Sequence, residues 1–288
     1  MTDNIPLAVI GGSGLYDLPQ LQERRELHLD TPFGAPSAPI QTGVLHGVDI
    51  AFLTRHGRGH TLAPGEINYR ANIFALKTLG VENVISVSAC GSLREDYQPG
   101  EFVIPDQLFD FTKHRRSTFF EAGLVGHIGT ADPFCPELSS LTERALAGSG
   151  GTVHAGGAFI TVEGPRFSTR LESNTFRTWG MSIIGMTTAP EAFLAREAEL
   201  CYTALAHVTD YDVWHAEGQP VSLPMVVESL DQNTPQVQHA MAEIVRSLAD
   251  RGSTCQCRSA LRQALITDPE HISPHTYQKL KPLISKYL

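Results

Sequence analysis

The stretch Tyr202-Thr-Ala-Leu-Ala-His-Val208, followed directly by Thr209-Asp-Tyr-Asp212, is the most informative part of this chain. A short apolar run of this kind predicts a buried strand. In open α/β sheets, ligands bind beyond the carboxyl ends of the strands, which is where Asp210 and Asp212 stand. If the extended geometry continues, both carboxyl groups point the same way, and one can act as a general acid toward a ring nitrogen. The alternative is an aspartate-rich turn that orders its own backbone.

The composition is that of an enzyme-like α/β protein. The 288 residues are 42% hydrophobic and include 25 glycines and 18 prolines, which suits a domain with many turns. The formal net charge of −9 and the lack of a basic tract argue against nucleic-acid binding. No apolar stretch reaches the length of a membrane-spanning helix, and the N-terminus has no signal-peptide pattern. We therefore expect a cytoplasmic protein with neither membrane nor nucleic-acid partners.

Strands and helices alternate along the chain up to the aspartate pair. Helical spacing of apolar residues predicts a helix within residues 65–79, and Thr188-Ala-Pro-Glu191 has the spacing of a capping box at the start of another. Apolar runs predict strands at residues 7–10, 48–53, 84–88, 102–104 and 159–162. This alternation predicts an α/β fold.

The remainder of the chain is expected to be helical. Residues 222–251 predict a helix that is interrupted near Asn233-Thr-Pro235, because Thr234 can cap a new helix. Short amphipathic helices follow. We expect a single α/β domain over residues 1–250, with a helical C-terminal extension over residues 251–288 packed on the same domain.

The cysteines are odd in number and scattered, unlike a secreted disulfide framework: Cys90, Cys135, Cys201, Cys255 and Cys257. Only Cys255 and Cys257 are close in sequence. Two thiolates without a second pair of ligands make a poor zinc site, which needs four. Two surface thiols are therefore expected, and a disulfide between them is the alternative.

Two loops after predicted strands offer donors for an anion. Ser13 lies in Gly11-Gly-Ser-Gly14, whose amides can line an anion site or simply form a turn. This loop lacks the third glycine of a dinucleotide fingerprint. Arg55 and His56 follow another strand, and a guanidinium suits phosphate oxygens. The alternative for them is a solvated surface.

Further strand-end loops add to this pattern. Ser88-Ala-Cys-Gly-Ser92 consists of small residues that let a ligand approach the backbone closely, although Cys90 is more commonly just a buried cysteine. Thr187 precedes a helix and can donate to an anion at its N-terminus, unless the site only caps the helix. Glu163-Gly-Pro-Arg-Phe-Ser168 supplies an aromatic ring with polar neighbours, as a nucleoside pocket needs. Together these loops indicate phosphate bound beside a purine, with Asp210 as the acid.

Several of these blocks occur in a fixed order over roughly residues 5–250: Ile10-Gly-Gly-Ser-Gly-Leu15, Arg55-His-Gly-Arg58, Asn68-Tyr-Arg-Ala-Asn72, Ala89-Cys-Gly-Ser-Leu-Arg94, Glu163-Gly-Pro-Arg-Phe-Ser168, Met186-Thr-Thr188 and Thr209-Asp-Tyr-Asp212. They closely resemble the trimeric purine nucleoside phosphorylases. The resemblance implies a single α/β domain with a mixed, partly barrel-like central sheet flanked by helices. It also implies reversible phosphorolysis of a nucleoside to a free base and a sugar 1-phosphate, in a homotrimer or a dimer of trimers. Inorganic phosphate is then a co-substrate, and no metal or organic cofactor is expected.

The same resemblance implies roles for individual residues. It assigns phosphate binding to Ser13, Arg55, His56, Ser88, Ala89 and Thr187. It assigns nucleoside binding to Phe167, Ser168, Met186, Asp210, Asp212 and Leu223, with Leu223 near the 5′ substituent. His127 is expected to act in its own site or in that of a neighbouring subunit.

Asp210 also bears on the choice of base. A carboxylate accepts a hydrogen bond from the amino group of a 6-aminopurine, whereas family members that act on 6-oxopurines have asparagine at this position. We expect a 6-aminopurine nucleoside, with a 5′-methylthio group preferred because Leu223 offers a 5′-hydroxyl no partner. The alternatives are a 6-oxopurine nucleoside phosphorylase and a non-catalytic nucleotide-binding protein. Cys255-Gln-Cys257 resembles an element that forms a disulfide in some heat-adapted relatives.

Overall fold

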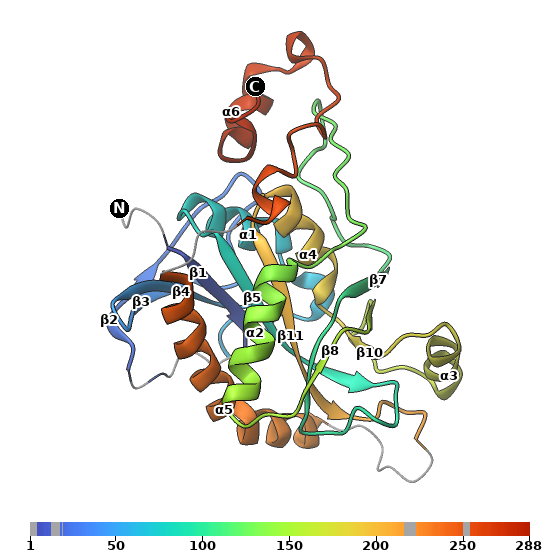
Figure 1. Cartoon of the computed structure of the whole chain (residues 1–288). Coiled ribbons are helices and arrows are strands. Elements are labelled where there is room, and N and C mark those ends of the chain that lie inside the picture. Colours follow the sequence, from blue (N-terminus) through green and yellow to red (C-terminus); the bar gives the residue numbers. More distant parts are fainter. Residues whose placement is uncertain (1–4, 13–17, 19, 216–222, 250–253) are drawn as a thin grey trace.

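The computed structural model describes residues 5–12, 18, 20–215, 223–249 and 254–288. Within these ranges, eleven strands form one mixed sheet flanked by helices (Figure 1), as expected for this fold class. The strands are β1 (Leu7–Gly11), β2 (Gln22–Leu27), β3 (Ile40–Leu45), β4 (Val48–Thr54), β5 (Asn83–Ser92), β6 (Phe102–Ile104), β7 (Gln107–Phe111), β8 (Val153–Ala155), β9 (Ala158–Val162), β10 (Ile183–Gly185) and β11 (Cys201–Asp210). The helices are α1 (Tyr69–Thr78), α2 (Pro136–Gly148), α3 (Arg170–Thr178), α4 (Thr188–Glu197), α5 (Leu223–Ala249) and α6 (Pro274–Ile284), with short 3-10 turns η1 (Pro64–Glu66), η2 (Gln256–Ser259) and η3 (Pro269–His271).

Strand β5 is the centre of the sheet, which divides there. β1 and β11 both run parallel to β5, while β10 pairs antiparallel with its last residues. One branch continues through β10 to β9 and β7, and the other through β11 to β6 and β8. Because β4, β1, β5 and β11 are mutually parallel in this order, their carboxyl ends meet on one side of the sheet.

The core lies on both faces of the sheet. All ten residues of β11 are buried, which explains why its sequence reads as a nearly continuous apolar run. Apolar side chains of α1, α4 and α6 join one buried cluster, and those of α2 and α5 join another. The apolar residues in the first half of β11 alternate between the two clusters, with Tyr202 and Ala204 in the first and Cys201 and Leu205 in the second.

Helix α5 corrects one expectation. It runs from Leu223 to Ala249 with Pro235 inside it, so the predicted interruption is wrong. The Thr234 hydroxyl donates to the carbonyl of Leu230, four residues earlier, instead of capping a new helix. None of the helices in the described part of the chain is long and apolar enough to cross a membrane.

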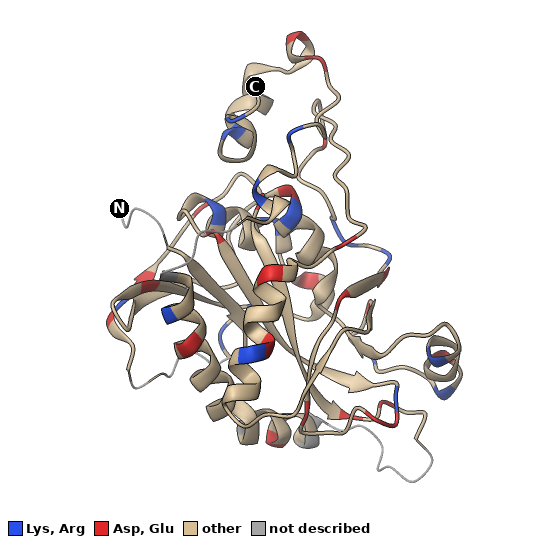
Figure 2. Cartoon of the chain, viewed as in Figure 1, with Lys and Arg blue, Asp and Glu red and all other residues tan. Residues whose placement is uncertain are grey.

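The C-terminal segment packs against the α/β body. Leu261, Leu280 and Leu283 belong to the same buried cluster as the apolar residues of α1 and α4. The expected boundary at residue 250 lies outside the described residues. Lys and Arg positions are interspersed with Asp and Glu positions along the ribbon in Figure 2, in keeping with the absence of a basic tract in the sequence.

The expectation of two surface thiols is wrong. Cys257 is 2% exposed, and Cys255 is half-buried. The reason is that η2 folds back onto the start of β11, where the Sγ atoms of Cys255 and Cys201 lie 3.2 Å apart. All five cysteines lie within the described residues, and none of them forms a disulfide.

Candidate active site

Strand β11 ends at the two predicted carboxyl groups. Its register with β5 shifts between Val208 and Asp210, so the backbone bulges there. The Asp212 amide donates to Oδ1 of Asp210 at 2.8 Å, and the Thr209 hydroxyl donates to Oδ2 at 2.7 Å. Asp212 itself has a φ of +49°, so the extended geometry does not continue to it. Residues 209–212 thus form the aspartate-rich turn that the sequence offered as the alternative. This turn holds the two carboxyl groups together.

Both carboxyl groups are in an environment that favours their protonated form. Asp210 and Asp212 are 8% and 9% exposed, and burial raises the pKa of each above its ordinary value. Oδ2 of Asp212 is buried and has no hydrogen-bond partner among the described residues. A buried carboxyl oxygen of this kind is costly unless a ligand pairs with it.

Gly91 of β5 makes room for this pair. A Cβ atom at this position would lie 3.0 Å from Oδ1 of Asp210 and 3.2 Å from Cβ of Asp212. Glycine is therefore needed here because strand and turn approach each other closely.

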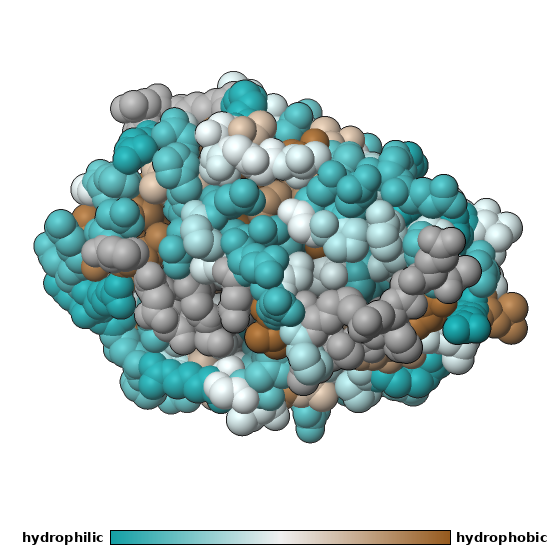
Figure 3. Space-filling model, turned by 90° about the horizontal axis from the view of Figure 1, so that it is seen from below, coloured by the Kyte–Doolittle hydropathy of each residue, from teal (hydrophilic) through white to brown (hydrophobic). Residues whose placement is uncertain are grey.

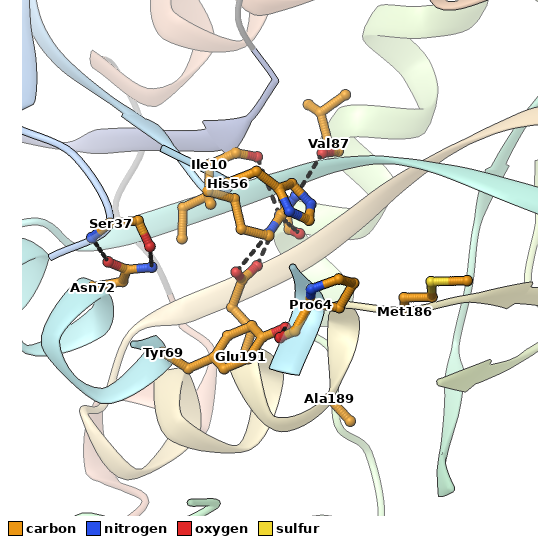
Figure 4. Close-up of polar contacts among 12 residues, drawn as sticks. Ile10, Ser37, His56, Pro64, Tyr69, Asn72, Val87, Met186, Ala189 and Glu191 are labelled. Carbon is orange, nitrogen blue, oxygen red and sulfur yellow. Dashed lines mark hydrogen bonds and ion pairs between the residues drawn. The ribbon is translucent and has the colours of Figure 1, made fainter. Parts of the chain in front are cut away.

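Arg55 is fully buried directly after β4, which rules out a solvated surface loop. Its Nε and Nη2 donate to the Glu191 carboxylate at 2.8 and 3.0 Å, and its Nη1 donates to the Val87 carbonyl at 3.1 Å. Figure 4 labels the two partners, Glu191 and Val87, and marks the hydrogen bonds to them as dashed lines. Nη2 also donates to the Ser86 hydroxyl at 2.6 Å. Burial alone would lower the pKa of Arg55, but the Glu191 carboxylate raises it above its ordinary value, so the guanidinium stays charged. The pair with Glu191 fixes its orientation.

Glu191 is a residue whose role the sequence did not indicate. The spacing from Thr188 predicted a capping box, but the helix N-cap is Thr187, and no side-chain hydrogen bond caps the helix within the described residues. Instead Glu191 is completely buried, pairs with Arg55 and accepts a hydrogen bond from the Tyr202 hydroxyl at 3.0 Å. Only the packing of α4 against the sheet brings these side chains together.

His56 follows Arg55 and is held as a neutral ring. Its Nδ1 lies 2.9 Å from the Leu62 carbonyl, so Nδ1 carries the proton and Nε2 has a free lone pair. Its ring stacks on that of His60 at 4.2 Å. Burial lowers the pKa of His56 to about 4, so the ring is neutral near pH 7. His56 can then accept a hydrogen bond at Nε2, while Arg55 supplies the positive charge.

The expected loop at Ser88 is part of β5, and the last residues of this strand meet the loop after β10 near Arg55, whose Nη1 donates to the Val87 carbonyl of β5. Because β10 runs antiparallel to β5, the chain after Gly185 passes Ala89; a Cβ on Gly185 would lie 3.5 Å from the Ala89 carbonyl oxygen. Thr187 is buried at the start of α4. The hydroxyls of Ser88 and Thr188 are buried without a hydrogen-bond partner in the parts of the chain that are described. Unpaired hydroxyls beside a fixed guanidinium form a site that suits an oxyanion.

Arg115 is a second residue that the sequence did not reveal. Its side chain is 2% exposed, and Nη1 donates to the carbonyls of Met186 at 2.6 Å and Ala189 at 2.7 Å. Nη2 donates to the Glu163 carbonyl at 2.8 Å. Arg115 thus ties the loop before α4 to the loop after β9. In the sequence it stands in a long polar connection, with no pattern that distinguishes it.

The remaining predicted residues are more exposed to solvent or lie outside the described residues. Phe167 is 44% exposed and Ser168 is half-buried, both on the loop between β9 and α3. His127 is exposed, and its amide donates to the Ala264 carbonyl at 2.8 Å in the C-terminal segment. Ser13 lies outside the described residues, and of Leu223 only the position at the start of α5 is described.

The chain is similar to known proteins in both sequence and structure. The family model of the phosphorylase superfamily matches residues 6–250. The S-methyl-5′-thioadenosine phosphorylase of Geobacter sulfurreducens is 50% identical over 98% of this chain and 99% of its own length. The crystal structure of a methylthioadenosine phosphorylase from an antarctic soil metagenomic library has a TM-score of 0.94 at 46% identity, covering 98% of this chain and 99% of that one. The Schistosoma mansoni methylthioadenosine phosphorylase in complex with adenine has a TM-score of 0.84 at 35% identity, covering 90% and 96%. The chain therefore belongs to the phosphorylase superfamily, in the family of the S-methyl-5′-thioadenosine phosphorylases.

Proposed function

We propose that this chain catalyses the reversible phosphorolysis of S-methyl-5′-thioadenosine to adenine and 5-methylthioribose 1-phosphate. The observation that carries the proposal is the pair of buried carboxyl groups, Asp210 and Asp212, whose pKa values are raised at the end of β11. They stand near the carboxyl ends of the parallel strands, as do the buried Arg55 and the unpaired Ser88 hydroxyl. The names of the relatives, and the adenine complex of the Schistosoma mansoni protein, support this substrate class.

Phosphate binds at the arginine. The proposed ligands share donor groups at the strand ends: Ser13, Arg55, His56, Ser88, Ala89 and Thr187. Arg55, fixed by Glu191, supplies the charge, and the hydroxyls supply further donors. His56, with its lone pair on Nε2, accepts from a phosphate hydroxyl. Because these groups are oriented before phosphate arrives, they hold it for attack on C1′ with little reorganisation.

The purine leaves toward the aspartates. Phosphate oxygen forms a bond to C1′ as the C1′–N9 bond breaks, and the electron pair passes into the purine ring. Protonated Asp210 donates its proton to N7 and neutralises the charge that develops there. A carboxyl oxygen also accepts from the N6 amino group, which favours a 6-aminopurine. Asp212, with its unpartnered Oδ2, lies beside Asp210 and faces the same edge of the base.

The sugar and its 5′ substituent lie between these two regions. Met186 is half-buried, and a Cβ on Gly164 would lie 2.6 Å from its Sδ, so the thioether is held against the loop after β9. We assign Met186 to the sugar, Phe167 and Ser168 to the wall of the nucleoside pocket, and Leu223 to the 5′-methylthio group. We expect no metal or organic cofactor in this reaction, because phosphate is the nucleophile and Asp210 is the acid.

The active form is proposed to be a homotrimer or a dimer of trimers. Exposed apolar side chains gather near α3 and β7: Phe109 at 41%, Trp179 at 50% and Leu171 at 78%. Hydrophobic residues are also seen at this end of the molecule, on the right of Figure 3. Phe109 and Trp179 contact each other edge to face, with ring centroids 6.0 Å apart. A clustered apolar patch of this kind favours contact with another copy of the chain. We propose that the exposed His127 reaches a neighbouring site in this assembly.

We place the protein in the cytoplasm. None of its five cysteines forms a disulfide, although four of them lie within 4.8 Å of one another, as suits a reducing compartment.

Base release from methylthioadenosine, adenosine and inosine, each with and without phosphate, tests the proposal. We expect rapid release of adenine from methylthioadenosine only when phosphate is present, and little release of hypoxanthine from inosine. Equal rates without phosphate would make the protein a hydrolase and remove the assigned role of Arg55 and His56. Preference for inosine would make it a 6-oxopurine phosphorylase and contradict the role of Asp210 in choosing the base.

A further inference from the structure

Four of the five cysteines come together at the end of β11 opposite to the aspartates. The Sγ atoms of Cys135, Cys201, Cys255 and Cys257 all lie within 4.8 Å of one another. Cys135 directly precedes α2, Cys201 is the first residue of β11, and the other two belong to the start of η2. Three of the four are buried and Cys255 is half-buried. Three segments far apart in sequence therefore converge on one group of thiols.

The distances suit a tetrahedral ion. A zinc–sulfur bond of about 2.3 Å places the sulfurs of a tetrahedral site about 3.8 Å apart. Sulfurs that already lie within 4.8 Å of one another need to move by only about 1 Å to reach that arrangement. The Sγ atoms of Cys201 and Cys255 lie 3.2 Å apart, well beyond the roughly 2.05 Å of a disulfide bond, and all four sulfurs lie within 4.8 Å of one another. The second pair of ligands that Cys255 and Cys257 lack in sequence is supplied by Cys135 and Cys201.

The surroundings hold these ligands in place. The Cys135 amide donates to the Tyr202 carbonyl at 2.8 Å, and the Cys201 amide donates to the Glu82 carbonyl at 3.0 Å. Both backbone segments are thus anchored to regular structure rather than to the cluster itself. Ligand positions fixed in this way reduce the cost of assembling a metal site.

A cation stands next to the cluster. Arg258 lines the same small cavity as Cys135 and Cys201 and pairs with Glu82 at 2.7 Å through Nη2. Its Nε is buried without a hydrogen-bond partner among the described residues. Four thiolates around one Zn²⁺ carry a net charge of about −2; Arg258 offsets part of this charge, while Glu82 and Glu137, which line the same cavity, add to it.

We propose that Cys135, Cys201, Cys255 and Cys257 bind a zinc ion in a closed, tetrahedral structural site that fastens the C-terminal segment to the α/β domain. Soft thiolate ligands in a tetrahedral set select zinc. All four coordination positions are taken by protein, so the ion has no open position for chemistry. The ten residues of β11 separate the site from Asp210 by about 30 Å, at roughly 3.3 Å per residue. The site is independent of the proposed reaction.

Metal analysis of the full chain, purified under reducing conditions, tests the proposal first. We expect about one zinc per chain. Protein stripped with a chelator in the presence of reductant, and then titrated with Co²⁺, is expected to develop the absorption bands of tetrahedral cobalt thiolate, which zinc then abolishes. A fully reduced chain with five titratable thiols that takes up neither ion at micromolar concentrations would overturn the proposal. Iron as the only bound metal would overturn the assignment of zinc.

Matched variants locate the ion. Cys257→Ser and Cys135→Ser are expected to lose most of the zinc, whereas Cys90→Ser, which changes a buried cysteine outside the cluster, is expected to retain it. Zinc retained in full by both cluster variants would place the metal elsewhere and refute the site. If these variants do not fold, the cobalt spectrum of the unmodified chain decides. Disulfides between these cysteines in a protein that binds no zinc after reduction would count against the proposal.

Discussion

Each end of β11 carries a buried polar cluster. The two clusters differ in whether their polar atoms have partners within the protein. At the Cys201 end, four thiols lie close enough to satisfy one ion among themselves. At the Asp210 end, the Ser88 hydroxyl and Oδ2 of Asp212 are buried without partners among the residues that the structure describes. A cluster that closes on itself stabilises the fold, whereas one with unpaired donors and acceptors is prepared for a ligand. One strand thus joins the proposed structural site to the proposed catalytic one.

The largest effect is expected from the buried ion pair at the catalytic end. Glu191→Ala leaves Arg55 charged, buried and without its carboxylate, and breaking such a pair costs about 3–5 kcal/mol of unfolding free energy. Chemical denaturation measures this loss. Asp96→Ala removes the exposed partner of Arg94 and is expected to cost at most about 1 kcal/mol. Equal losses of unfolding free energy in the two variants would show that burial of the Arg55–Glu191 pair does not stabilise the fold.

Asp210→Asn is expected to reduce adenine release by at least about 10²-fold, because the amide cannot donate the proton that N7 needs. The zinc content of this variant should equal that of the unmodified chain, since Asp210 lies at the other end of the strand. The rate on methylthioadenosine and the metal content are measured on the same preparation. Turnover close to normal would remove Asp210 from the mechanism.

The pH dependence of stability should come partly from Glu197, which lies at the C-terminal end of α4. Burial raises the pKa of Glu197 to about 7 from an ordinary value of 4.5. The folded chain therefore binds a proton that the unfolded chain releases between these values, so stability falls as pH rises from 4.5 to 7. The change is on the order of 1–3 kcal/mol. Glu197→Gln, which resembles the protonated form, should flatten this part of the curve of unfolding free energy against pH. The same slope in the variant would exclude Glu197 as its source.

Gly91→Ala is expected to have the smallest effect. The added Cβ, 3.0 Å from Oδ1 of Asp210, shifts the carboxyl groups by a few tenths of an ångström and lowers kcat by about 10-fold. Gly148→Ala is the control, since a Cβ at the end of α2 meets no described atom within 4 Å. Steady-state rates of both variants measure the difference. If the two variants have the same kcat, the close approach of β5 to the aspartates does not matter for catalysis.

The strands that the sequence predicted are those that lie inside the fold. The apolar runs at residues 7–10, 84–88 and 202–208 correspond to β1, β5 and β11, because strands covered on both faces carry a continuous apolar pattern. β2 was not predicted, since it is an edge strand of exposed and charged residues that leaves no such pattern. The interruption predicted at Pro235 failed because proline and a capping residue are local signals, and the packing of α5 on the domain outweighs them.

By itself, the sequence predicted which strand ends carry the proposed chemistry. Asp210, Arg55 and Ser88 each follow an apolar run directly, and parallel strands bring such ends to one side of a sheet. Only the tertiary structure decided which side chains meet. Glu191 pairs with Arg55 across 136 residues, and Cys135 joins three cysteines from the far part of the chain. Such contacts depend on how helices and loops pack against the sheet. A local pattern of residues cannot predict a partner that is so distant in sequence.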